Sequence, residues 1–524
     1  MMRTVSNRVL PLAFRYVSVL LAALLVYYVI REPLNDAVSN AVFLGKGSLH
    51  GPEQGNEPAD IAAARVAKTA DEKAQLAAVA AVEGVPGNKV QEPMGNVDVP
   101  YVKRYKPEPP PSKPIGDHFP YLRFSDSPPP VLDNNLPPFP HVEEPTPLLI
   151  GFTRNWPLLL QCVSSYITAG WPPEDIYIVE NTGTFHANRN GALELQNPFF
   201  MNHTALTILG VKILETPTLL SFSQLQNYFL SLALEHDWPH FWWSHMDVMV
   251  FSDEDVKKKD RDHDWDHDPY ATIYERCVGL LRYLNGPDMP PWGTHFFQFD
   301  HLALVNRDAY LNVGAWDTQI PYYASDCDMY LRLHWAGYWQ PQSEAGLVFD
   351  VASVFDDIAV LFRLPGSHAT FEGDPVYAQQ TPGSSEDERA HHEADLKREK
   401  DMYPWVEKEG ETFAHLIEVA GRMQDLKWKD EGTRRNEWQI RQMGGKDDPF
   451  YRDPEGFAAG VETLVDAGRR VFADKWGHRG CDLIAMGIEG KDAWRLERDW
   501  DINEGPGSVG GNWGRDWMTG SDGE

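Results

Sequence analysis

The sequence predicts an α/β domain built on a mostly parallel sheet with helices on both faces. From Leu148 the chain reads strand, helix, strand in quick succession: LLIGFTRN, then Trp156 to Ala169 with helical periodicity, then IYIVENTG. A unit of this kind implies parallel strands. The same alternation continues downstream, and acidic residues follow two of the later segments. Ligands of such sheets bind at the carboxyl ends of the strands, so these residues mark a candidate site.

The remaining elements follow in chain order. LTILGVKIL predicts a strand, Ser223 to Glu235 a helix, and FWWSHMDVMVF one buried strand. HLALVNRDAYLNVG and LVFDVASVF predict later strands of the same sheet. Beyond Gly383 the composition changes, and charged or amphipathic patterns favour helices over three segments, 386–398, 412–428 and 457–476.

The N-terminal segment from Val9 to Ile30 is almost entirely apolar and long enough to span a bilayer. Positive charge is concentrated before it, at Arg3 and Arg8, which predicts a cytosolic N-terminus and a lumenal remainder. A cleaved signal peptide is the alternative, although no clean small-residue cleavage site follows. The glycosylation sequon at Asn202 is usable only in the lumen.

The predicted organisation follows from these shifts in composition. A Pro-dense run that ends at Pro147 forms no packed core and predicts an extended stem. The segments are a cytosolic tail (1–8), a transmembrane helix (9–30), a stem (31–146), the α/β domain (147–383), a helical extension (384–490) and a disordered tail (491–524). Four cysteines are too few for a disulfide scaffold, and one or two bridges with open pairing remain possible.

The charge of the chain bounds its partners. A net charge of -30 argues against nucleic acid or an anionic membrane surface as the main partner. It fits a protein that meets anionic nucleotides only through a divalent cation. The sequence contains no P-loop, no G-x-S-x-G and no H-E-x-x-H, so NTPase and hydrolase interpretations have no local support.

Two acidic segments carry the predicted chemistry. The first ends the apolar run at His245, Met246 and Asp247; a carboxylate there is a suitable ligand for a hard divalent cation bound to a diphosphate. His245 is expected to contact the ribose or phosphate, or to serve as a nitrogen ligand of Mn²⁺. The simpler interpretation is that both residues only end a strand and cap a turn.

The second acidic segment carries a resemblance. Gly314-Ala315-Trp316-Asp317, then Tyr322-Tyr323-Ala324-Ser325-Asp326-Cys327-Asp328, then Arg332 and Gly337-Tyr338, resembles the acceptor-side signature of family 2 glycosyltransferases of the GT-A fold. The segment before it, with His245 and Asp247, takes the place of the D-x-D motif of that fold. The resemblance covers roughly Leu148 to His368.

The resemblance implies roles for individual residues. Asp326 matches the general base, Ser325 departs from the family's Glu, and Asn227 matches an Asn in the helix before D-x-D. His368 matches the late His that many GT-A enzymes bring to the metal. Asp328 is expected to cap a helix instead. From their place after the second strand, Glu180 and Asn181 are expected to contact the nucleotide.

The expected protein is therefore an inverting, Mn²⁺- or Mg²⁺-dependent glycosyltransferase in a type II arrangement in the Golgi or endoplasmic reticulum membrane. Its donor would be a nucleotide-diphosphate sugar, and its acceptor a glycan, a glycoprotein or a lipid-linked molecule. The substitutions at His245 and Ser325 leave a second hypothesis open, a non-catalytic lumenal protein that binds nucleotide-sugars or serves as a scaffold. A third is a glycoside hydrolase with paired carboxylates.

Overall fold

The strands form one six-stranded sheet and a separate two-stranded ladder. The structure is a computed structural model that describes residues 115–254, 270–374, 411–428 and 454–500, all of which belong to one compact unit, Lys103–Glu524. The predicted transmembrane segment, most of the stem, the helix at 386–398 and most of the predicted C-terminal tail (501–524 of 491–524) lie outside these residues. Within the described ranges no helix is long and apolar enough to cross a membrane.

The six-stranded sheet has the order β3-β2-β1-β4-β7-β6. Strands β3, β2, β1 and β4 pair in parallel, and β7 runs antiparallel to its neighbours β4 and β6. The predicted α/β class and mostly parallel sheet are confirmed. The strands are β1 Leu148–Phe152, β2 Ile176–Glu180, β3 Lys212–Glu215, β4 His240–Ser244, β6 Thr294–Phe297 and β7 Leu302–Asn306. The ladder pairs β5 Val248–Phe251 with β8 Leu347–Asp350.

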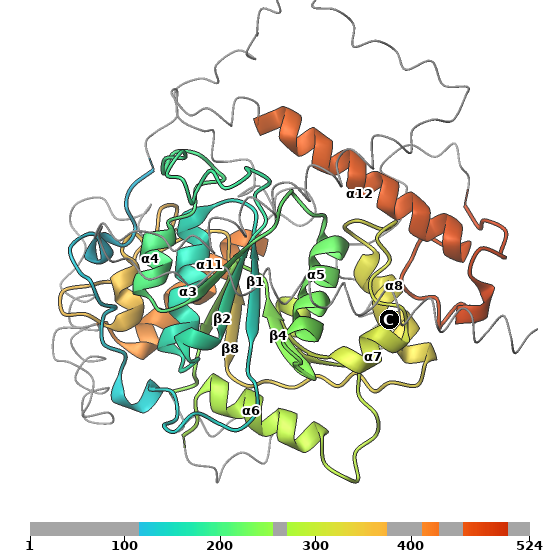
Figure 1. The fold of residues 1–524 in the computed structure, drawn as a ribbon, viewed down its shortest axis with the longest axis horizontal. Helices are drawn as coiled ribbons and strands as arrows, with labels where there is room; N and C mark the ends of the chain where they lie inside the picture. Colours follow the sequence, from blue (N-terminus) through green and yellow to red (C-terminus); the bar gives the residue numbers. More distant parts are fainter. Residues whose placement is uncertain (1–114, 255–269, 375–410, 429–453, 501–524) are drawn as a thin grey trace, which may run out of the picture. The chain divides into compact units, whose positions relative to one another are not determined.

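Helices cover both faces of the sheet (Figure 1), with α3 and α11 on one side and α5, α7 and α8 on the other. The α-helices are α3 Trp156–Thr168, α4 His203–Ile208, α5 Phe222–Glu235, α6 Ile273–Leu284, α7 Arg307–Asn312, α8 Ser325–Trp335, α11 Phe413–Trp428 and α12 Pro454–Trp476. Short 3-10 helices are η1 Pro120–Arg123, η2 Asp133–Asn135, η3 Pro173–Asp175, η4 Phe299–His301, η5 Ile358–Phe362 and η7 Gly490–Asp492.

The alternation of side chains along β1 divides the core into two. Leu148, Ile150 and Phe152 pack on the α3 side, whereas Leu149 packs on the α5 side. Because successive side chains of a strand point to opposite faces, an apolar strand serves both layers at once. This explains why the strands read as continuous apolar runs.

Four of the predicted strands are wrong in extent or place. LVFDVASVF is only β8 Leu347–Asp350, which belongs to the ladder and not to the large sheet. FWWSHMDVMVF is two strands, because the chain leaves the large sheet at His245 and re-enters an extended conformation at Val248 in the ladder. LTILGVKIL is mostly α4 and a turn before β3, and HLALVNRDAYLNVG is β7 followed directly by α7. Strand β6 and helix α6 were not predicted at all. The helices predicted over 412–428 and 457–476 are present as α11 and α12.

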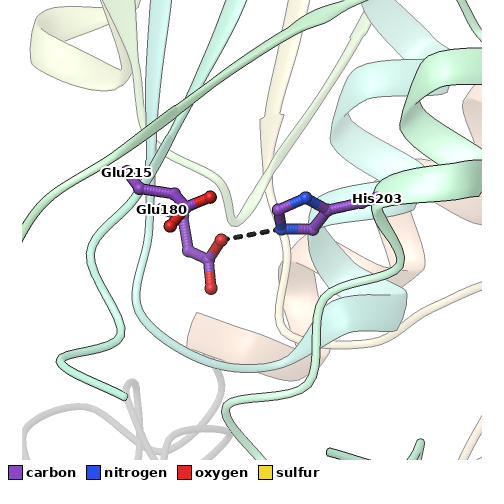
Figure 2. A group of neighbouring side chains, drawn as sticks. All are labelled: Glu180, His203 and Glu215. Atoms are coloured by element: carbon purple, nitrogen blue, oxygen red, sulfur yellow. Dashed lines mark hydrogen bonds and ion pairs between the residues drawn. The ribbon is translucent and has the colours of Figure 1, made fainter. Parts of the chain in front are cut away.

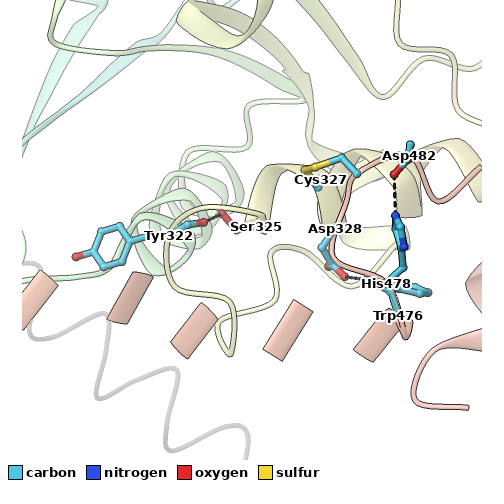
Figure 3. Close-up of a disulfide and its surroundings, with 8 residues drawn as sticks. Tyr322, Ser325, Cys327, Asp328, Trp476, His478 and Asp482 are labelled. Atoms are coloured by element: carbon cyan, nitrogen blue, oxygen red, sulfur yellow. Dashed lines mark hydrogen bonds and ion pairs between the residues drawn. A yellow bond between two sulfur atoms is a disulfide. The ribbon is translucent and has the colours of Figure 1, made fainter. Parts of the chain in front are cut away.

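A disulfide attaches the end of the described chain to α8. Cys327, inside α8, is bonded to Cys481, which follows α12 (Figure 3). Around it, Ile320, Leu331, Phe472 and Trp476 form a small core of their own. The two remaining cysteines, Cys162 and Cys277, are free and buried. The C-terminal helix is thus fixed to the element that carries Asp326.

Replacing Cys327 and Cys481 together with alanine should lower the free energy of unfolding by about 2–5 kcal/mol, because the bond closes a loop across 154 residues. Urea unfolding of the full-length protein measures the loss. Cys277→Ala is the matched control, since it removes a buried thiol without removing a crosslink. A double variant that loses no more than the control would show that the crosslink contributes nothing.

Candidate functional site

A cavity of about 330 Å³ opens at the carboxyl ends of β1 and β4. Strand β1 has β2 on one side and β4 on the other, so the order of strands reverses between β1 and β4. Open α/β sheets bind ligands at such a reversal. Helix α12 adds an apolar wall. The lining residues used below are Arg154, Asn181, Trp243, His245, Asp247, Asp300, Tyr323, Ser325, Asp326, Phe457, Val461 and Val465.

Two carboxylates meet at this cavity, of which Asp247 is part of its lining. Asp247 directly precedes β5, and Asp350 is the last residue of β8. The ladder places Val248 opposite Asp350, and the Val351 N–H donates to the Asp247 carbonyl at 2.8 Å. Both carboxylates contact the same Lys427 ammonium, so they lie close together, an arrangement that destabilises the fold unless a positive charge compensates it.

Lys427 of α11 supplies that charge. Its Nζ donates to Asp247 Oδ2 at 2.7 Å and to Asp350 Oδ1 at 2.5 Å, and only 1% of its side chain is exposed. Burial alone would raise the pKa of Asp247, but the Lys427 charge and the nearby His245 outweigh it and hold that pKa well below its usual range. The pair and the lysine form one buried ionic unit.

Two histidines face the other oxygens of the pair. His245 Nδ1 lies 3.7 Å from Asp247 Oδ1, and His301 Nε2 lies 3.8 Å from Asp350 Oδ2. Burial lowers the pKa of His301. Burial also acts to lower the pKa of His245, but the nearby Asp247 and the other surrounding carboxylates outweigh it, and the pKa of His245 is raised. His245 is therefore the more readily charged of the two.

The donor set at Asp247 does not fit the expected divalent cation. A metal needs free carboxylate oxygens, yet one oxygen of Asp247 accepts from the Lys427 ammonium and the other faces His245. His368, the second expected ligand, is exposed and does not line the cavity. The expected Mn²⁺ or Mg²⁺ site at Asp247 and His368 is not assembled in this arrangement.

Asp326 lies in the cavity on the first turn of α8. Ala324, the residue before the helix, is in the left-handed region with φ 70°, which turns the chain sharply into the helix start. Burial raises the pKa of Asp326 to about 6, and the negative charge of Asp300 on η4 is the second cause. A carboxylate with such a pKa is well suited to accept a proton near neutral pH.

Asp328 has a different environment from Asp326, although both belong to α8. Its carboxylate accepts from Lys475 Nζ at 2.6 Å, from Trp476 Nε1 at 3.2 Å and from Arg332 Nε at 2.8 Å. The carboxylate makes no helix cap, and its side chain is fully buried (Figure 3). The predicted capping role is wrong, because the neighbouring α12 delivers a lysine and an indole to it.

The predicted nucleotide contacts separate into those that line the cavity and those that do not. Asn181 lines it, although its Oδ1 already accepts from the Leu220 N–H at 2.7 Å. Asn227 does not line it; its amide donates to the Trp316 carbonyl and accepts from the Trp316 N–H, both at 2.9 Å. Both hydrogen-bonding ends of Asn227 are thus engaged in holding the Trp316 loop.

Glu180 ends β2 but is turned away from the cavity into a network of its own (Figure 2). It accepts from Asn188 at 2.7 Å and pairs with His203 Nε2 at 2.8 Å. Glu215 lies close enough for Glu180, His203 and Glu215 to form a candidate metal cluster. Arg189 already pairs with Glu215, so the cluster is balanced by protein charges.

Sequence reasoning missed three residues of the site. Lys427 was included only within a charged helix, and Asp300 and Arg154 were not considered. Arg154 follows β1 by two residues, lines the cavity and lies 4.3 Å above the Phe457 ring of α12. Its position at a strand end was the available signal, since the same rule singled out Asn181.

Known proteins resemble this chain only in the loose arrangement of the fold. No family model and no curated protein matches the chain. The mannosyltransferase PcManGT from Pyrobaculum calidifontis, in complex with GDP-Man and Mn²⁺, is similar over 41% of this chain and 58% of its own, with 12% identity and a TM-score of 0.27. The match thus spans less than two thirds of that protein.

A cytidylyltransferase from Leptospira borgpetersenii serovar Hardjo-bovis (strain JB197) is similar over 54% of this chain and 98% of its own, with 10% identity and a TM-score of 0.27. Both proteins are transferases by name. Superpositions this loose carry no information about the activity of this chain, which has to be inferred from its site.

The opposite environments of the two α8 carboxylates predict opposite effects on stability. Asp328→Asn should lower the free energy of unfolding by about 3–5 kcal/mol, because it leaves buried cations without their partner. Asp326→Asn should leave stability at pH 7 unchanged or raise it. The raised pKa of Asp326 means that the folded state binds the proton more tightly, so stability falls as pH rises from the ordinary Asp value through about 6.

Urea unfolding of both variants at pH 5 and pH 7 measures these effects. The advantage of Asp326→Asn over the wild type should grow between the two pH values, and the deficit of Asp328→Asn should persist at both. Equal losses in the two variants would contradict the assignment of their environments.

Proposed function

We propose that the protein is a glycosyltransferase that moves a sugar from a nucleotide-sugar donor to an acceptor hydroxyl. The observation that carries the proposal is Asp326, a carboxylate with a pKa of about 6 inside a cavity at the reversal of the strand order. The resemblance of the segment around Asp326 to the acceptor side of family 2 glycosyltransferases supports the same role.

The chemistry follows from the position of this base. Asp326 takes the proton of the acceptor hydroxyl while the hydroxyl oxygen forms a bond to the anomeric carbon of the donor. The bond from that carbon to the diphosphate oxygen breaks, and the nucleoside diphosphate leaves with the electron pair. Attack on the face opposite the leaving group inverts the configuration at the anomeric carbon. The departing negative charge is received by His245 and Arg154, the positive groups among the lining residues.

The residues of the cavity wall indicate which kinds of acceptor the site can bind. Helix α12 contributes Phe457, Val461 and Val465, and Tyr323 lies on the same side with Arg469 5.2 Å above its ring. Aromatic faces pack against the C–H surfaces of sugars, and apolar walls also accept lipid-linked molecules. A glycan, glycoprotein or lipid-linked acceptor is compatible with this surface.

We place the domain in the lumen of the secretory pathway, in a type II arrangement in the Golgi or endoplasmic reticulum membrane. The Cys327–Cys481 bond supports an oxidising compartment, and the apolar segment from Val9 to Ile30 supports an anchor. Asn202 is partly exposed, although its side chain also caps α4. Protection of the C-terminus from protease in intact vesicles tests the placement, and digestion there contradicts it.

A non-catalytic nucleotide-sugar-binding or scaffold protein is the second candidate. The observation that favours it is Lys427, which occupies the oxygen that Asp247 would offer to a metal. Both candidates bind a nucleoside diphosphate in the same cavity, and turnover separates them.

Asp326→Asn should reduce turnover by about 10²–10⁴-fold, because a sugar hydroxyl is a poor nucleophile without a positioned base. Donor affinity should remain unchanged, since the variant keeps the shape of the side chain. Release of nucleoside diphosphate from UDP- and GDP-sugars with mixed acceptors measures turnover, and calorimetry with UDP and GDP measures binding. Full turnover in the variant would remove the mechanism, and binding without any turnover in the wild type would favour the second candidate.

Asp300→Asn tests the same base by moving its pKa. The raised pKa of Asp326 predicts that wild-type kcat/KM falls as pH drops below about 6, where the base becomes protonated. Removing the negative charge of Asp300 should lower the pKa of Asp326 and shift this acid limb to lower pH. A pH profile of both proteins measures the shift. An acid limb that stays in place would show that another group controls it.

A further inference from the structure

Lys427 occupies a position that normally belongs to the apolar core. On α11, the buried side chains of Leu416, Val419 and Met423 point into the main core, and Lys427 follows Met423 by one turn on the same face. A buried lysine is costly unless it is paired. Here it donates to Asp247, to Asp350 and, at 3.4 Å, to the Val351 carbonyl. Its three protons are therefore all accounted for.

Helix α11 is held in register with these acceptors. Gln424 Oε1 accepts from the Asp350 N–H at 3.0 Å, which fixes the helix to the end of β8. The helix and the ladder thus place the ammonium between the two carboxylates as a built feature of the core. An ammonium with three oxygen partners takes the place that a divalent cation with carboxylate ligands would occupy.

We propose that the Lys427 ammonium is the resident cation of this site, so that the protein binds its donor without a divalent metal, and that His245 contacts the donor phosphate. The second part rests on the proposed function. His245 Nδ1 is directed to Asp247, while its buried Nε2 has no hydrogen-bond partner within the described part of the chain. His245 also lines the cavity, and Nε2 is its ring nitrogen that no described oxygen engages.

The charges around the cavity agree with this division of roles. Lys427 neutralises part of the negative charge of Asp247 and Asp350, so that Asp247 repels a diphosphate less strongly. On the cavity side, His245 and the nearly buried Arg154 provide the positive groups. Asp326 and Asp300 lie in the same cavity and keep one part of it acidic, as an acceptor base requires.

Titration with Mn²⁺ alone tests the first part without any nucleotide. Electron paramagnetic resonance counts Mn²⁺ bound to full-length wild type and to Asp247→Asn. We expect identical binding curves, because both oxygens of Asp247 already face positive groups. Mn²⁺ also binds to other carboxylates of an acidic protein, and the comparison of the two proteins cancels this background binding. A site present in the wild type and lost in Asp247→Asn would overturn the proposal.

Lys427→Met provides the complementary test, because this variant should gain a Mn²⁺ site that the wild type lacks. Without the ammonium, two carboxylates face each other, so the melting temperature should fall by several degrees and millimolar Mn²⁺ should restore part of the loss. Lys475→Met is the matched control, because Lys475 also bridges two aspartates, Asp317 and Asp328, but Arg332 still compensates one of them. No greater rescue in Lys427→Met than in this control would contradict the proposal. If Lys427→Met does not fold, the comparison of Mn²⁺ binding between the wild type and Asp247→Asn still tests whether a metal binds at Asp247.

Nucleotide binding tests the second part. Calorimetry with UDP and GDP should give the same affinity in EDTA and in Mn²⁺, and His245→Gln should weaken binding by about 10- to 100-fold through loss of a charged hydrogen bond. Affinity that collapses in EDTA, or that is unchanged in His245→Gln, overturns it. If the wild type binds neither nucleotide, the proposed function fails, while the Mn²⁺ comparison still decides the role of Lys427.

Discussion

The ion pairs of Lys427 with Asp247 and Asp350 are the interaction on which the arrangement of the site depends. Asp247, just before β5, and Asp350, at the end of β8, both contact the Lys427 ammonium near the point where the chain leaves the large sheet. Without a compensating charge the two neighbouring carboxylates would repel each other, and removing one partner of a buried pair typically costs about 3–5 kcal/mol. Helix α11, which comes from the C-terminal part of the chain, therefore completes the core as well as the site.

A second set of ion pairs positions the other side of the cavity. Lys475 and Trp476 of α12 hold Asp328, and the disulfide is made by Cys327, the preceding residue of α8. These contacts fix the start of α8, where Asp326 lies in the cavity. Lys427 thus holds the segment at Asp247, and Lys475 holds the segment at Asp328. The separation of roles is clear on α8, where Asp328 is structural and Asp326 remains available for chemistry.

The sequence predicted the class of the fold because its signals are local. The apolar strands and the helical period of α3 and α5 are visible over a few residues, and so is the acidic segment at Asp326. The break between β4 and β5 was missed because Met246 continues the apolar run, and only the pairing of β5 with β8 reveals two sheets.

The ion pairs could not be predicted for a different reason. Lys427 meets Asp247 across 180 residues of sequence, and a lysine in a charged helix reads as solvated until its partners are known. The same applies to Asp328, whose partners Lys475 and Trp476 lie 147 and 148 residues away. Local patterns favoured a helix cap there. The network that turns Glu180 away from the cavity was equally invisible, because it depends on the position of His203.

The most direct test of this account is a crystal structure of the protein grown with UDP or GDP and MnCl₂, with anomalous data collected at the manganese edge. The account predicts nucleotide density in the cavity between β1 and β4, phosphate oxygens within hydrogen-bonding distance of His245, and Lys427 still between Asp247 and Asp350 with no anomalous peak beside them. A manganese peak on Asp247 with Lys427 displaced, or nucleotide bound elsewhere, would contradict it.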